Sequence, residues 1–160
     1  MKEIFKNFYV GTGEEFEEYV YFKADWAVVH AAKEPWHRKL LGYTTKAAPK
    51  DHPEYLMARR NLVLFLNLVD VKDPVYIKDE IINAALDFIG EHLAQEKKVF
   101  IHCNQGQSRA PSIAFLYLVR IGELTGKLPD MLAKFKVLYP NYLPSDGMRL
   151  YIEHRLHHRL

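Results

Sequence analysis

Cysteine is nearly absent from this sequence. The 160 residues contain only one, Cys103, so no internal disulfide can form. No apolar run is long enough to cross a bilayer. The charged start MKEIFKNFYV also lacks the uninterrupted apolar core of a signal peptide. We therefore expect a cytoplasmic protein.

Internal repeats, low-complexity segments and Gly/Ser-rich linkers are missing as well. The formal net charge is only +2, with acids and bases spread along the chain, so nothing demands nucleic acid or a membrane surface as a partner. A mild positive balance does suit an anionic ligand. About half the residues are apolar, and the chain is long enough for a full core. We expect one domain over residues 1–160.

Strands and helices alternate along the chain. Strand-like runs rich in β-branched or aromatic residues occupy residues 5–10, 26–30, 62–69 and 99–102. Helical patterns occupy residues 78–95, 113–121, 129–138 and 145–156. The first helix carries one apolar stripe, and the second, with Pro111 in its first turn, is apolar nearly all round. This alternation predicts an α/β fold with a central sheet flanked by helices.

Two segments lack a clear structural pattern. Residues 31–53 have weak periodicity and three prolines, which predicts a surface connection, with a substrate-contacting loop as the alternative. The histidines of the tail HRLHHRL have no carboxylate or cysteine beside them at liganding spacing. We therefore predict no metal site there.

The single cysteine lies between the strand at 99–102 and the apolar helix, in the stretch VFIHCNQGQSRAPSIA. Loop amides wrapped at a helix N-terminus form, with the helix dipole, a concave site for a tetrahedral anion. Gly106 permits close backbone approach, and the planar fork of Arg109 can bind two phosphate oxygens. The predicted phosphate-binding residues are Asn104, Gln105, Gly106, Gln107, Ser108 and Arg109.

The position of Cys103 in this loop suits a nucleophile. Amide dipoles and a neighbouring arginine favour the ionised form of a cysteine. A thiolate beneath a bound phosphorus can attack it. The alternative is a buried structural thiol.

His-Cys, five residues and Arg resemble the active-site motif of the cysteine-dependent protein tyrosine phosphatases. The wider pattern is most similar to the dual-specificity group, because the motif lies in the second half of the chain, follows the helix containing Asp87 and Phe88, and is completed by Gly106, Ser108 and Arg109. The resemblance implies a phosphate-binding loop between a strand and a buried helix. It also implies that Cys103 takes the phosphoryl group, Arg109 binds it and His102 tunes the thiolate from behind, with no metal and no cofactor.

The relatives also imply a general acid, an aspartate on the loop after the third main strand. Two residues are candidates here, Asp70 and Asp73 in VDVKDP. Counting back from the following helix favours Asp73. Asp70 directly ends the strand, where relatives often carry the acid. We expect Asp73 to be the acid and keep Asp70 as the alternative.

The sequence departs from the motif at Ala110, where most relatives have Ser or Thr to stabilise the departing cysteine sulfur. Ser112 lies two residues further on. This departure leaves the first chemical step in place and puts the rate of the second in question. It is also the main argument for a catalytically silent phosphoprotein-binding domain.

The remaining side chains of the loop are neutral, which argues against a polyanionic lipid. We expect a phosphotyrosine and/or phosphoserine/threonine protein phosphatase working through a cysteinyl-phosphate intermediate. Its partner would be a phosphorylated protein or peptide, with phosphate or another oxyanion in the site and neither membrane nor nucleic acid involved. An RNA 5′-phosphatase is a lower-ranked alternative, since five cations could form a polyanion track: Lys39, Lys46, Lys50, Arg59 and Arg60.

Overall fold

The centre of the fold is a six-stranded sheet in the order β1-β2-β6-β3-β5-β4. The structure is a computed structural model that describes residues 1–160. Its strands are β1 (Lys2–Phe5), β2 (Phe8–Gly11), β3 (Ala27–His30), β4 (Met57–Arg60), β5 (Val63–Leu66) and β6 (Val99–His102). The inner strands β2, β6, β3 and β5 run parallel, whereas β1 and β4 pair antiparallel at the two edges.

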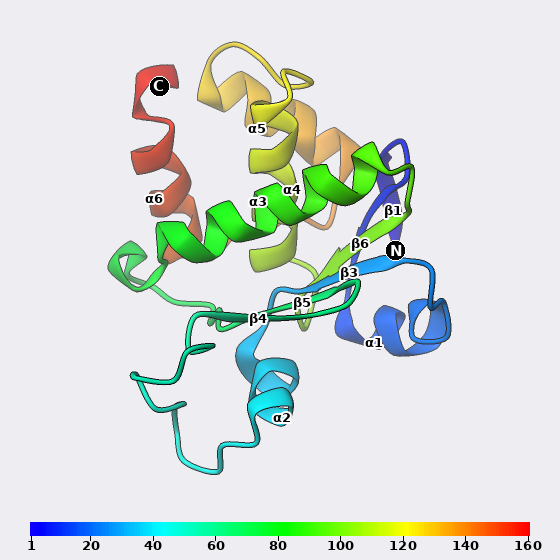
Figure 1. The fold of residues 1–160 in the computed structure, drawn as a ribbon. Coiled ribbons are helices and arrows are strands. Elements are labelled where there is room, and N and C mark those ends of the chain that lie inside the picture. The colour runs from blue at the N-terminus through cyan, green and yellow to red at the C-terminus, as the bar shows by residue number, and fades with distance from the viewer.

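Helices cover both faces of the sheet (Figure 1). One face carries α3 (Asp79–Ala94), α4 (Arg109–Arg120), α5 (Leu128–Leu138) and α6 (Asp146–Arg155). The other carries α1 (Gly13–Glu15), η1 (Phe16–Val20), η2 (Lys33–His37) and α2 (Arg38–Leu41). Two short turns, η3 (Pro74–Tyr76) and η4 (His157–Arg159), complete the chain. The prediction of an α/β fold with a flanked central sheet is confirmed.

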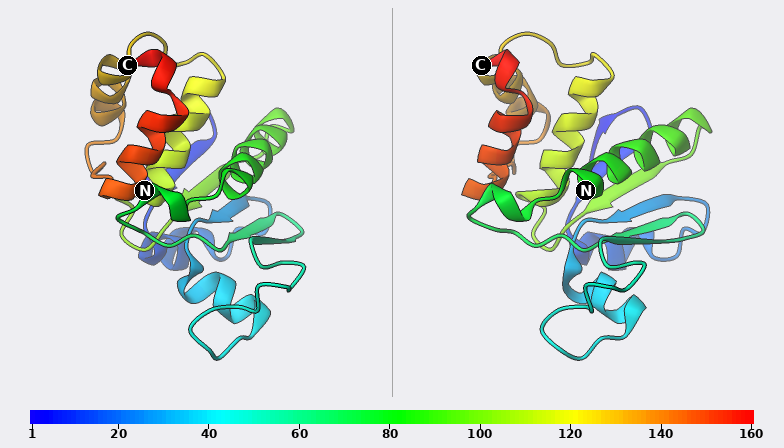
Figure 2. Two further views of the ribbon diagram at one scale, coloured as in Figure 1. Left: turned by 90° about the vertical axis from the view of Figure 1, so that its left-hand side faces the viewer. Right: turned by 60° about the vertical axis from the view of Figure 1, so that its left-hand side comes forward.

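Burial explains the order of the layers. Every residue of β3 and β6 is buried, as expected for central strands covered on both faces. The apolar stripe of α3 packs inward on the sheet, and the residues Ala110 to Leu118 of α4 are all buried. Figure 2 shows α4 beside α6 above the sheet, and the two helices are in contact. Helix α4 is thus held in the core, with its first turn at the end of β6.

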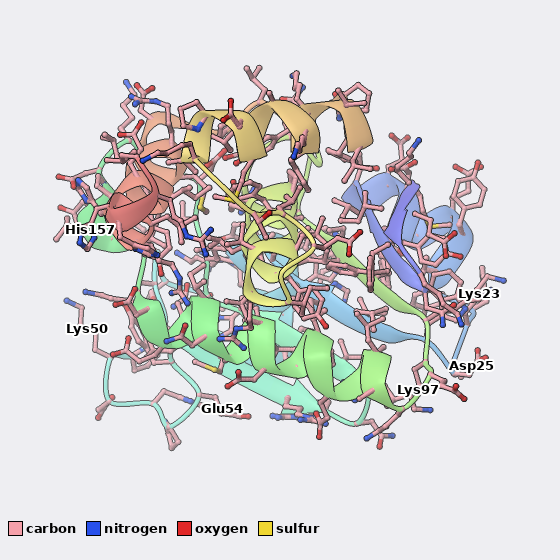
Figure 3. All side chains as sticks on the ribbon, turned by 90° about the horizontal axis from the view of Figure 1, so that it is seen from above. Lys23, Asp25, Lys50, Glu54, Lys97 and His157 are labelled. Atoms are coloured by element: carbon pink, nitrogen blue, oxygen red, sulfur yellow. The ribbon has the colours of Figure 1, made fainter.

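The parallel strands give the sheet two distinct ends. Lys23, Asp25 and Lys97 lie together near the ends at which β3 and β6 begin (Figure 3). The carboxyl ends of the same strands lie at the opposite end of the sheet, where α/β folds hold their ligands. The loop that contains Cys103 leaves β6 at that end.

Two expectations from the sequence need correction. Residues 5–10 are not one strand, because Lys6 and Asn7 form a turn between β1 and β2, with Asn7 in the left-handed region at φ 65°. Residues 31–53 are more than a surface connection, since they contain η2, α2 and the fully buried His37. The basic edge strand β4 and the helical residues 13–20 were not predicted. None of the helices combines the length and apolar character that a membrane crossing requires.

Candidate active site

The cysteine loop (residues 103–109) wraps around the N-terminus of α4. Gly106 has φ 67°, and a Cβ there would lie 2.8 Å from the Gly11 carbonyl oxygen. Both the backbone angle and the space therefore require glycine. The buried Tyr139 hydroxyl donates to the Gly106 carbonyl at 2.7 Å and supports the loop from below.

The loop encloses a cavity of about 280 Å³. Its lining consists of Asp70, Cys103, Asn104, Gln105, Gln107, Ser108, Arg109 and Leu143. Cys103 is only 2 % exposed, so the cavity is its route to solvent. Arg109 is the only cationic side chain in the lining. The cavity thus brings one guanidinium and one thiol together.

The guanidinium of Arg109 is fixed by two hydrogen bonds. Nη1 donates to the Leu68 carbonyl at 3.0 Å and Nη2 donates to Asn104 Oδ1 at 2.7 Å. Nε is buried and donates to no protein acceptor. Since buried donors are normally satisfied, a guanidinium held this way fits an oxyanion, whose oxygens accept from Nε and from the second N–H of a terminal nitrogen.

Asn104 ties the cysteine loop to two other segments. Its side-chain Nδ2 donates to the Glu34 backbone carbonyl at 3.0 Å, and its backbone carbonyl accepts from the Gly13 amide at 3.0 Å. The same side chain accepts from Arg109. One residue thus connects η2, α1 and the arginine.

The two candidate acids lie in different places. Asp70 lines the cavity, and its Oδ1 accepts from the Ser108 hydroxyl at 3.0 Å. Asp73 caps η3, accepting from the Val75 amide at 3.0 Å, and lines a separate hollow with Tyr151 and His154. The structure therefore does not support the preference for Asp73. A side chain used as a helix cap outside the cavity is poorly placed to protonate a leaving group, and Asp70 takes its place as the candidate.

His102 lies behind Cys103 and is paired with a second histidine. Strands β3 and β6 end in register at His30 and His102, and His30 Nδ1 lies 2.6 Å from His102 Nε2. His102 Nδ1 lies 2.9 Å from the Cys103 carbonyl, which can only accept. We therefore assign the proton to Nδ1 of His102, leaving Nε2 to accept from Nδ1–H of His30.

Burial holds both imidazoles neutral. It lowers the pKa of His30 from 6.5 to about 2, with the neighbouring His102 as a second cause. It lowers the pKa of His102 from 6.5 to about 4, against the opposing effect of the Cys103 carbonyl. Trp36 stacks on His30 at 5.3 Å and Phe16 on His102 at 5.1 Å, which keeps water away from the pair.

The histidine pair should make stability depend on pH. The unfolded chain takes up protons on both histidines below about pH 6.5 while the folded chain does not, so the free energy of unfolding should fall as the pH falls. Between pH 6.5 and 5 the two histidines together should lower the free energy of unfolding by roughly 3 kcal/mol. Urea unfolding at pH 7, 6 and 5 measures this, and His30→Gln should show about half of that decrease. Equal decreases in both proteins would contradict the assignment.

Comparison with known proteins identifies the fold. No family model matches the chain, and no curated protein matches it. Among solved structures, the human tyrosine phosphatase-like serine/threonine/tyrosine-interacting protein is similar with a TM-score of 0.66 and 16 % identity, covering 98 % of this chain and 95 % of the other. Human DUSP28 has a TM-score of 0.61 and 14 % identity, with 100 % of both chains covered. The active form of Tk-PTP has a TM-score of 0.60 and 18 % identity over 99 % of this chain and 97 % of that one.

This chain has the dual-specificity phosphatase fold. The resemblance inferred from the sequence is confirmed at the level of fold. At 14 % to 18 % identity the likeness concerns the fold alone, so the chemistry has to be argued from the residues of the site.

No nearby hydroxyl replaces the one that Ala110 lacks in this dual-specificity phosphatase fold. Ala110 is fully buried at the start of α4. The Ser112 hydroxyl is also buried, 2.8 Å from the Tyr142 hydroxyl, and is thereby engaged away from the cavity. Trp36 and Tyr43 do not line the cavity either.

Three residues at the site were not anticipated: His30, Leu143 and Gly147. A histidine at the end of each of two buried strands was a signal for the first, because parallel neighbours in register bring strand ends together. Leu143 lines the cavity and Gly147 contacts the loop that carries Asp70. Their sequence positions carry no comparable signal, since their place depends on how α6 docks.

Proposed function

We propose that this chain is a protein phosphatase that hydrolyses phosphotyrosine and/or phosphoserine and phosphothreonine through a cysteinyl-phosphate intermediate. The observation that carries this proposal is the joint placement of Cys103, Arg109 and Asp70 in one cavity, with Nε of Arg109 buried and unpartnered. A nucleophile, an oxyanion clamp and a proton donor are the groups that phosphoryl transfer needs.

In the first step the Cys103 sulfur attacks the phosphorus while Arg109 and the loop amides hold its equatorial oxygens. The S–P bond forms and the bond from phosphorus to the leaving oxygen breaks. Asp70, in its acid form, gives its proton to that oxygen. The products are the dephosphorylated residue and phosphocysteine.

In the second step water attacks the phosphocysteine. The Asp70 carboxylate takes a proton from the water, the new O–P bond forms, and the S–P bond breaks to return the thiolate and inorganic phosphate. His102 contributes indirectly: its Nδ1–H donates to the Cys103 carbonyl and fixes the start of the cysteine loop. These steps require no metal and no cofactor.

The cavity supports a substrate with a single phosphate. Arg109 is its one cation, and Gln105 and Gln107 are neutral. The polyanion track of an RNA 5′-phosphatase gains little support, since Arg59 pairs with Glu91 at 2.9 Å and Arg60 with Glu54 at 2.6 Å. A phosphorylated protein or peptide is the partner that this lining fits.

Arg109→Lys tests the proposal. Lysine keeps the charge but loses the planar fork, so kcat/KM for an aryl phosphate should fall about 10²-fold or more, as when an oxyanion donor is removed. Arg120→Lys is the matched control, since Arg120 lies at the other end of α4 and pairs with Asp87 on the surface. Hydrolysis by Arg109→Lys at the parent's rate would show that Arg109 does not hold the phosphate.

The absence of a hydroxyl at Ala110 should slow the second step. Ala110→Ser is expected to raise kcat about 10-fold, the effect of one hydrogen bond to a departing charged sulfur worth roughly 1.4 kcal/mol. The value of kcat/KM should stay unchanged, because it reports only the steps up to and including formation of the phosphocysteine. An unchanged kcat, measured on the same aryl phosphate, would mean that release from Cys103 is not slow.

A phosphoprotein-binding domain without turnover is the second candidate function, and the observation that favours it is Ala110 with Ser112 engaged elsewhere. Absence of hydrolysis of aryl, peptide and nucleotide phosphates, together with measurable phosphopeptide affinity, would identify the chain as such a domain.

A further inference from the structure

The segment that joins α5 to α6 lies across the cysteine loop and the loop that carries the acid candidates, here called the acid loop (residues 69–74). Two of its backbone amides, and a third from the first turn of α6 (Asp146–Arg155), donate to these loops. Leu143 donates to the Gln107 carbonyl at 2.8 Å, and Ser145 donates to the Ser108 hydroxyl oxygen at 2.8 Å. Gly147 donates to the Val71 carbonyl at 3.0 Å. The segment and the first turn of α6 together connect the cysteine loop to the acid loop.

The Ser108 hydroxyl joins these contacts to Asp70. It accepts from the Ser145 amide and uses its own proton to donate to Asp70 Oδ1 at 3.0 Å. Asp70 is thus held at its carboxylate through Ser108. Its backbone is held one residue further on, where Val71 meets Gly147.

Gly147 is needed at this contact for its lack of a side chain. A Cβ there would lie 2.2 Å from the Val71 carbonyl oxygen and 2.8 Å from the Val71 carbonyl carbon. Both are backbone atoms, which cannot rotate away as a side chain can. Gly147 sits in the first turn of α6 without a positive φ, so the close approach of the acid loop, and not the backbone angle, excludes a side chain.

We propose that Gly147 is a positioning residue for the general acid: the first turn of α6 holds the acid loop so that Asp70 faces the cavity that contains Cys103. This role rests on the proposed function, because it presumes that Asp70 protonates a leaving group. All of the contacts are made within the chain itself, so the acid is in place before a substrate enters.

Gly147→Ala tests the role through the leaving group. The methyl group must push Val71 outward and move Asp70, whereas the bonds that hold the cysteine loop at Gln107 and Ser108 involve other amides. We expect kcat/KM for phenyl phosphate, which has a basic leaving group, to fall about 10- to 10²-fold. For 2,4-dinitrophenyl phosphate, which departs without a proton, the change should stay within about twofold.

Two further variants isolate the effect. Gly90→Ala is the matched control, since a Cβ at Gly90 in α3 meets only the Tyr117 side chain, at ordinary distances of 3.7 and 3.9 Å. Both esters should react as with the parent. In an Asp70→Asn background, Gly147→Ala should cause no further loss on phenyl phosphate, because the proton that it misplaces is already gone.

If Gly147→Ala does not fold, as judged by thermal unfolding, Ser145→Pro provides a second route. Proline suits the φ of −63° at this position, and it removes both the amide that donates to Ser108 and the hydroxyl that caps α6 at the Met148 amide. The same selective loss on phenyl phosphate is expected.

Equal losses on both esters, no loss on either, or an additive loss in the Asp70→Asn background would overturn the role of Gly147 while leaving the proposed function in place. A parent protein that hydrolyses neither ester would instead overturn the proposed function, and with it the premise of this role.

Discussion

Cys103→Ser is expected to reduce turnover to background while phosphopeptide binding persists. The serine hydroxyl keeps the shape of the cavity and leaves Arg109 and the loop amides in place. It ionises far too weakly at neutral pH to attack phosphorus. Steady-state hydrolysis of an aryl phosphate and a phosphotyrosine peptide measures the loss, and fluorescence anisotropy of the labelled peptide measures the binding.

The control for this prediction is the double variant Cys103→Ser/Arg109→Ala. It should lose the phosphopeptide, because the guanidinium is the only cationic side chain in the cavity. Retained turnover in Cys103→Ser would exclude the thiol as nucleophile. Retained peptide binding in the double variant would place the peptide at another surface.

Asp70→Asn should show a loss that depends on the leaving group. An amide has no proton to give, so kcat/KM for phenyl phosphate should fall roughly 10²-fold or more, within the usual range for general acid catalysis. The value for 2,4-dinitrophenyl phosphate should change much less. The comparison uses kcat/KM, because a slow second step at Ala110 can hide the first step in kcat.

Asp73→Asn is the matched control for this assignment. It removes a charge from the same loop, but one that caps η3 outside the cavity, so both esters should react nearly as with the parent. If the two variants exchange their patterns, Asp73 is the acid, and the loop must move from the position described above.

The parts of this protein that the sequence predicted are those with local causes. The stripe of α3 and the apolar body of α4 follow from helical periodicity, and the loop from Cys103 to Arg109 follows from residue types at fixed spacing between a strand and a helix. Each of these depends on neighbours within a few residues. The structure has them where the sequence indicated.

The parts that the sequence did not predict depend mainly on contacts between distant segments. Asp70 and Asp73 are three residues apart, and which one enters the cavity is decided by the path of the loop: Asp73 turns back to cap η3, and Gly147 holds Val71 from the far end of the chain. The hairpin of β1 and β2 is an exception, because it depends on a local turn in which Asn7 adopts a left-handed conformation. His30 meets His102 only because β3 and β6 pair in register.

The central claim is that the phosphoryl group is transferred to the Cys103 sulfur and then to water. A quenched turnover experiment tests this claim most directly. The protein is mixed with excess 2,4-dinitrophenyl phosphate, denatured with detergent at alkaline pH during turnover, where the S–P bond persists, digested and analysed by mass spectrometry. We expect the peptide that contains Cys103 to carry one phosphoryl group, and Cys103→Ser to carry none. Product formation with the phosphoryl group on another residue, or on none at any quench time, would contradict the account.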